Sequence, residues 1–180
     1  MGDFEELAAE LNLTVKAAKS PEGLEERYLF SHDESYRYAF TRWWGRLSIE
    51  NFWLWVMLNP AGNKPGTKRR PTLGRIVDRS MAHGAAGVIT INLFALCAPK
   101  PDALKRAADP IGPVNDLVIN YFTDRAAITV AAWGSHGKIN QRSTTVQPLL
   151  RSAVCLGKTS SGEPRHPLYV RGDVESEPWP

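Results

Sequence analysis

The fold class follows first from an uninterrupted apolar run, Phe52-Trp53-Leu54-Trp55-Val56-Met57-Leu58, which leads directly into Asn59-Pro60. A half-buried strand alternates apolar and polar residues, and this run does not alternate. It therefore predicts a strand that is buried on both faces, as in a parallel sheet covered by helices. Asn59-Pro60 marks the end of the strand, because proline cannot donate a ladder hydrogen bond.

Three further segments have the same construction. The apolar runs are Val88 to Ile91, Ile128 to Ala132 and Val154 to Leu156, and they lead into Asn92-Leu93-Phe94, into Trp133-Gly134 and, after a turn, into Arg165-His166-Pro167-Leu168-Tyr169. Between the runs, helical spacing predicts helices at about 71–83, 114–124 and 137–151, the last one weakened at Pro148. This alternation predicts an α/β fold, a three-layer α/β/α sandwich with a central four-stranded, mainly parallel sheet.

The two ends of the chain lie outside this pattern. Residues 1–13 are expected to form a short amphipathic helix, so residues 1–24 are interpreted as a helical appendage to a single domain over residues 25–180. The segment from Tyr36 to Phe40 alternates like a strand, and it is interpreted as an edge strand packed on the core or, alternatively, as an aromatic and basic surface for nucleic acid. The tail from Arg171 onward is acidic and contains proline, and we expect it to be loosely held.

Composition limits the classes of protein that need considering. The 180 residues are 43% apolar, no apolar stretch approaches the roughly 20 residues of a membrane span, and the acidic first residues do not resemble a signal peptide. A cytoplasmic protein without membrane association is therefore expected. A monomer is also expected, although composition does not bear on it. Cys97 and Cys155 are expected to be free thiols, and with no zinc-type Cys/His spacing neither a metal nor a cofactor is predicted.

The net charge of +3 is unevenly distributed. Between Gly62 and Ser80, six basic residues stand against one acid, Asp78; they are Lys64, Lys68, Arg69, Arg70, Arg75 and Arg79. A run of this kind is either a solvated face or a surface that binds phosphates. A charge run is usually a solvated face, but this one follows a strand end and contains glycine and proline, which favours a loop that contacts phosphates. Both interpretations therefore stay open.

Parallel strands place their carboxyl ends at one edge of a sheet, and ligands of open α/β sheets bind at that edge. Asn59, Asn92, Trp133-Gly134 and His166 all follow predicted strands. We therefore expect them to converge on one site, although convergence alone does not name the chemistry.

The motifs Met57-Leu58-Asn59-Pro60, Asn92-Leu93-Phe94-Ala95, Ala132-Trp133-Gly134 and His166-Pro167-Leu168-Tyr169 resemble a bacterial and phage family catalogued as domain of unknown function 1643. The resemblance covers about residues 36–179. More distantly, the same series is similar to the uracil-DNA glycosylase superfamily, which implies a glycosylase-like fold and hydrolysis of a base–sugar bond.

The resemblance also implies roles for individual residues. Asn59 would hold the hydrolytic water and His166 would stand beside the base, so these two are the candidate catalytic residues. Asn92, Phe94 and Trp133 would bind the base, and Leu168 or Tyr169 would fill the gap that a flipped base leaves in DNA. Phosphates would contact a basic and helix-terminal set: Lys68, Arg69, Arg70, Thr72, Arg75, Ser135, Lys138 and Arg165.

The chemistry of these side chains fits that implication. A histidine can donate a hydrogen bond to charge developing on the leaving base, and an asparagine amide can read a Watson–Crick edge. Asn59 cannot deprotonate water, so a modest rate is expected. Simpler interpretations exist: Asn59 could cap its own turn, Asn92 could bind local backbone, and Trp133 could belong to the core.

The resulting hypothesis is a DNA glycosylase-like enzyme that removes a damaged, mispaired or modified base from DNA. Two alternatives remain open, a non-catalytic DNA-binding module and an enzyme acting on free nucleotides or nucleosides. A Ser135–His136 hydrolase pair is disfavoured, because neighbouring residues in one loop rarely form such a pair and no Gly-x-Ser-x-Gly motif is present.

Overall fold

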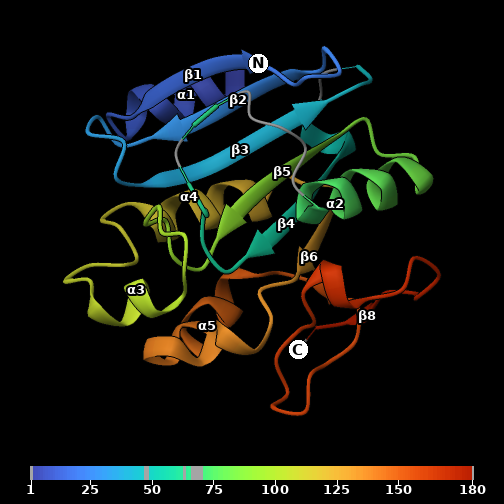
Figure 1. The fold of residues 1–180 in the computed structure, drawn as a ribbon. Coiled ribbons are helices and arrows are strands. Elements are labelled where there is room, and N and C mark those ends of the chain that lie inside the picture. Colours follow the sequence, from blue (N-terminus) through green and yellow to red (C-terminus); the bar gives the residue numbers. More distant parts are fainter. Residues whose placement is uncertain (1, 47–48, 63, 66–70, 180) are drawn as a thin grey trace.

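The computed structural model describes residues 2–46, 49–62, 64–65 and 71–179 (Figure 1). Over these residues the strands form one mixed sheet of eight strands in the order β1-β2-β3-β5-β4-β6-β7-β8. The strands are β1 (Thr14–Lys19), β2 (Glu25–Phe30), β3 (Arg37–Trp43), β4 (Phe52–Met57), β5 (Gly87–Asn92), β6 (Ile128–Ala131), β7 (Val154–Cys155) and β8 (Glu177–Pro178).

The four expected strands form the parallel core of this sheet. β4 pairs in parallel with β5 and with β6, and β6 pairs in parallel with β7. Every residue of β4 and β5 is buried, as their lack of alternation predicts. In register, Met57 lies opposite Asn92, which brings the residues after these two strands to one edge.

The sheet is larger than the four strands expected from the sequence. β1, β2 and β3 form an antiparallel meander, and β3 pairs antiparallel with β5. The segment at 36–40 was therefore wrongly expected at the edge, because β1 and β2 continue the sheet beyond it. The expected boundary at residues 24 and 25 falls between β1 and β2, which pair over six residues.

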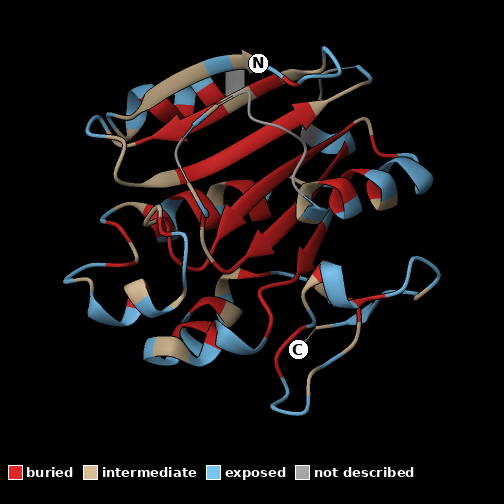
Figure 2. Cartoon of the chain, viewed as in Figure 1, coloured by how far each residue is buried: buried red, intermediate tan, exposed pale blue. Residues whose placement is uncertain are grey.

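Helices cover both faces of the sheet. The larger apolar cluster packs α1 (Gly2–Glu10), α3 (Asp102–Arg106), α4 (Asn115–Thr123) and α5 (Arg142–Val146) against one face. A second cluster packs α2 (Pro71–Ala82) and Val170, which follows the 3₁₀ turn η4 (Pro167–Tyr169), against the other face. Phe4 and Leu7 of α1 belong to the larger cluster, so the first helix shares the core of the protein (Figure 2).

Two expectations for the C-terminal third are wrong. The continuous helix expected at 137–151 is instead η2 (Ser135–Gln141), α5 and η3 (Gln147–Leu149), because Asn140 and Gln141 adopt positive φ angles of 52° and 56°. The tail is not loose. β8 pairs with β7, and the Arg79 guanidinium donates hydrogen bonds to three backbone carbonyls between residues 171 and 174.

Candidate functional site

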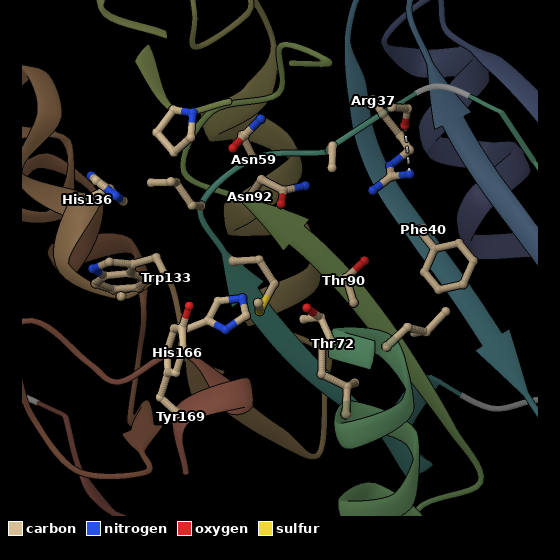
Figure 3. A pocket seen from close by; sticks show the side chains of 18 of the residues that line it. Arg37, Phe40, Asn59, Thr72, Thr90, Asn92, Trp133, His136, His166 and Tyr169 are labelled. Atoms are coloured by element: carbon tan, nitrogen blue, oxygen red, sulfur yellow. Dashed lines mark hydrogen bonds between the residues drawn. The ribbon is translucent and has the colours of Figure 1, made fainter. Parts of the chain in front are cut away.

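A cleft of about 640 Å³ opens on the sheet face that α2 and η4 cover. It begins at the carboxyl edge of the parallel strands, where the loops after β4, β5 and β6 meet η4, and extends across the sheet to β3 and β2. Figure 3 shows labelled side chains from β3, β5, α2, η4 and the loops after β4 and β6 around one open space.

The structure brings the three central candidates together. Asn59, Asn92 and His166, hereafter the rim residues, all line this cleft. Five further predicted residues line it as well: Thr72, Trp133, Ser135, Arg165 and Tyr169.

Other predicted residues lie elsewhere. Phe94 is fully buried in the larger apolar cluster and does not line the cleft. Leu168 is 38% exposed beside Tyr169 but does not line the cleft, nor do Arg75 and Lys138. Lys68, Arg69 and Arg70 lie outside the described residues.

Asn59 is held by its own loop. Its side-chain nitrogen donates to the carbonyls of Pro60, at 3.0 Å, and Ala98, at 2.7 Å. These two bonds fix the orientation of the amide, because only the nitrogen can donate. The capping interpretation is thus correct for the amide nitrogen, and the amide oxygen remains as an acceptor at the cleft.

Asn92 carries a buried donor without a partner. The side chain is 2% exposed, and within the described part of the chain its amide nitrogen has no hydrogen-bond acceptor. An unsatisfied buried polar group costs about 1–3 kcal/mol, so its presence calls for a physical reason. The backbone beside it is fixed, since the Asn115 amide donates to the carbonyls of Asn92 and Leu93 at 3.0 Å each.

His166 has a defined tautomer. The backbone N–H of Leu168 donates to Nδ1 of His166 at 3.3 Å, so the proton of the neutral ring lies on Nε2. Burial lowers the pKa of His166 below its usual value of 6.5, because a charged imidazolium is poorly solvated there. The ring is therefore neutral at pH 7 and presents a single N–H donor.

The Trp133-Gly134 motif packs against the backbone side of His166. Gly134 has φ 74° and ψ −172°, and a Cβ at this position would lie 3.3 Å from the Cβ of His166. Its backbone N–H donates to the Pro164 carbonyl at 2.9 Å, which ties the two loops together. Trp133 is 2% exposed and donates from Nε1 to the buried Glu163 carboxylate at 2.5 Å.

The sequence did not indicate the part of the cleft that lies over β2 and β3. Tyr28 lies opposite Phe40 in the sheet register, and Phe40 lies opposite Thr90. Together with Leu73 of α2 these residues line what we name the inner chamber. Its end is formed by Glu26 and Arg42, which are 0% and 1% exposed. From β3 only Phe40 and Arg42, two positions apart, line this part, so the aromatic alternation of the segment does not by itself mark it.

Charge is arranged in two zones along the cleft. Lys64 and Arg165 line it as exposed cations, and Arg37 adds a third, half-buried one. In the inner chamber, Arg42 donates to the Glu26 carboxylate from Nε at 2.9 Å and from Nη2 at 2.5 Å. This pair neutralises itself. The accessible charge of the cleft is therefore positive and suits an anionic ligand such as a phosphate.

The sequence profile of the family described as protein of unknown function (DUF1643) matches residues 37–168. Because this match covers more than half of the chain, the protein belongs to that family. Searches of curated proteins and of solved structures found no significant match. In the described part of the chain no helix is long and apolar enough to span a membrane, and no three His, Cys, Asp or Glu side chains are grouped to hold a metal ion.

Proposed function

We propose that the protein is a DNA glycosylase-like enzyme that hydrolyses the N-glycosidic bond of a damaged, mispaired or modified base. The observation that carries the proposal is the meeting of three functional groups in one cleft: the Asn59 acceptor, the unpaired Asn92 donor and the neutral His166 N–H. Each of them matches one requirement of base excision.

The leaving base needs hydrogen-bond donors. Cleavage of the glycosidic bond sends its electron pair to the base, which develops negative charge while the sugar becomes oxocarbenium-like. The Nε2–H of His166 can donate to that charge, and a donor in such a position contributes roughly 3–4 kcal/mol to the transition state. Burial disfavours the protonated form of His166, and the neutral imidazole still carries the N–H that this role requires.

The sugar needs a water. The amide oxygen of Asn59 can accept a hydrogen bond from this water and orient it toward the anomeric carbon. The water oxygen bonds to that carbon, one water proton passes to solvent, and the departing base takes a proton from solvent. Because an amide is not a base, positioning alone is expected here, and a modest rate follows.

Asn92 is the candidate for reading the base. An acceptor on the edge of a bound base would satisfy its unpaired amide N–H, which otherwise costs free energy. The positive charge of Lys64, Arg165 and Arg37 at the cleft supports a nucleic acid over a neutral ligand. The exposed ring of Tyr169, next to His166, supports a stacking contact with a neighbouring base.

The test is an abasic-site assay on single-stranded and duplex oligonucleotides that contain uracil, hypoxanthine or substituted pyrimidines. We expect base release from at least one substrate and a loss of about 100-fold or more in His166→Ala. His32→Ala is the matched control, because His32 is an exposed histidine that does not line the cleft. Salt-sensitive DNA binding without base release by the wild type would favour the non-catalytic alternative, and binding of mononucleotides that is insensitive to salt would favour free nucleotides.

A further inference from the structure

The cleft continues well beyond the rim residues. Thr90 and Asn92 are two positions apart on one face of β5, which places them about 7 Å apart along the strand. From Thr90 the floor passes to Phe40 on β3 and to Tyr28 on β2. That is two strand spacings, about 10 Å, so an unsubstituted base held by Asn92 would not reach the far end.

The walls of the inner chamber are mostly apolar and aromatic. The Tyr28 and Phe40 rings pack at 4.9 Å with an interplanar angle of 55°, and Leu73 packs against the same cluster. Such a surface favours an apolar stem or a flat group over a phosphate. One polar group is available along it, the Thr90 hydroxyl, for which the described residues provide no hydrogen-bond partner.

The end of the chamber has no spare charge. Glu26 accepts from Arg42 through one oxygen and from the Tyr28 hydroxyl, at 2.6 Å, through the other. An additional anion would meet the Glu26 carboxylate, and an additional cation would meet the Arg42 guanidinium. An uncharged occupant avoids both costs.

We propose that the inner chamber accommodates a bulky, uncharged substituent on the base, so that the preferred substrate is an enlarged, modified base. This inference rests on the proposed function, because it places the base itself at the rim residues. The substituent would run from the base at Asn92, past Thr90, to the aromatic surface of Phe40 and Tyr28.

The experiment measures binding and base release with one set of oligonucleotides. Each carries one pyrimidine at the same position, either unsubstituted, 5-hydroxymethylated, or bearing a longer uncharged alkynyl chain that ends in a hydroxyl. We expect affinity to rise with length and to reach about tenfold over the unsubstituted base, as burial of roughly two methylene groups would give. Leu73→Trp, which fills the chamber, should bring the ratio of the two affinities toward one.

Met81→Trp is the matched control, because it adds the same ring at an exposed position of the same helix. Should Leu73→Trp fail to fold, the length series on the wild type still decides. Equal or weaker binding of the enlarged bases overturns the inference, and so does a gain that Leu73→Trp leaves intact. Release of the unsubstituted base with no length preference overturns this inference but supports the proposed function. Length-dependent binding without release of any base supports the chamber as a binding site but contradicts the proposed glycosylase activity. If an oligonucleotide with an unmodified nucleotide beside the test pyrimidine gains as much affinity over one with an abasic neighbour, the chamber holds the neighbouring base, and this also overturns the inference.

Discussion

Replacement of Arg42 by methionine tests the buried ion pair that closes the inner chamber. Glu26 and Arg42 are 0% and 1% exposed, and Arg42 supplies both hydrogen bonds to one carboxylate oxygen of Glu26. In Arg42→Met the carboxylate keeps only its bond from the Tyr28 hydroxyl. Loss of one partner from a buried pair costs about 3–5 kcal/mol, because the remaining charge is left without compensation.

This cost converts to a measurable change in thermal stability. For a chain of this length, each kcal/mol shifts the melting temperature by about 2–4 °C, so Arg42→Met should melt at least about 6 °C below the wild type. The double variant Glu26→Gln/Arg42→Met should recover much of the loss, since no buried charge remains. Urea unfolding and thermal melting, both followed by circular dichroism at pH 7, measure the two quantities.

The control for this prediction is Lys105→Met. Lys105 pairs with Asp102 at 3.1 Å, but both side chains are more than half exposed, so the change should stay within about 1 kcal/mol. A loss below about 1 kcal/mol for Arg42→Met would refute the reasoning, as would a double variant whose cost equals the sum of the two single costs.

Three further predictions concern His166, its support by Gly134, and the attachment of the tail. Because burial lowers the pKa of His166, its neutral form stabilises the fold above pH 6.5, and this contribution is lost as the pH falls through the folded pKa; an NMR titration midpoint at or above 6.5 would contradict this. The same spectra should show the neutral ring protonated on Nε2. Gly134→Ala should destabilise the protein by about 1–3 kcal/mol in urea, because its backbone conformation is essentially restricted to glycine, and an unchanged midpoint would oppose this. Arg79→Lys should loosen residues 171–174 and speed their amide hydrogen exchange, whereas Arg75→Lys on the exposed side of the same helix should not.

The parallel core was predictable because its strands are apolar without alternation. Burial on both faces leaves that mark on a sequence, and the runs beginning at Phe52 and Val88 carry it clearly. The meeting of Asn59 and Asn92 then follows from parallel strand direction, whereas His166 is placed by the loop after β7, which the Gly134 N–H holds at the Pro164 carbonyl. β1 escaped prediction because Thr14–Lys19 is a short edge strand whose residues are half-buried or exposed, so it lacks a continuous apolar run.

The inner chamber could not be predicted for a different reason. Its residues come from β2, β3, β5 and α2, and only the antiparallel register of the meander places Tyr28 beside Phe40 and Phe40 beside Thr90. Phe94 is the opposite case, since the sequence predicted it as a site residue but it does not line the cleft. Asn92 is the last residue of β5 and lines the cleft, whereas Phe94, two positions further along the chain, packs into the larger apolar cluster.

The far end of the cleft is formed partly by residues that precede the family match. The family match begins at residue 37, where β3 starts, whereas Glu26 and Tyr28 precede it on β2. A different hairpin in place of β1 and β2 would change the depth and lining of the cleft, while Asn59, Asn92 and His166 would keep their positions. The lining of the far end can therefore vary through the residues of β2 without any change in the three rim residues.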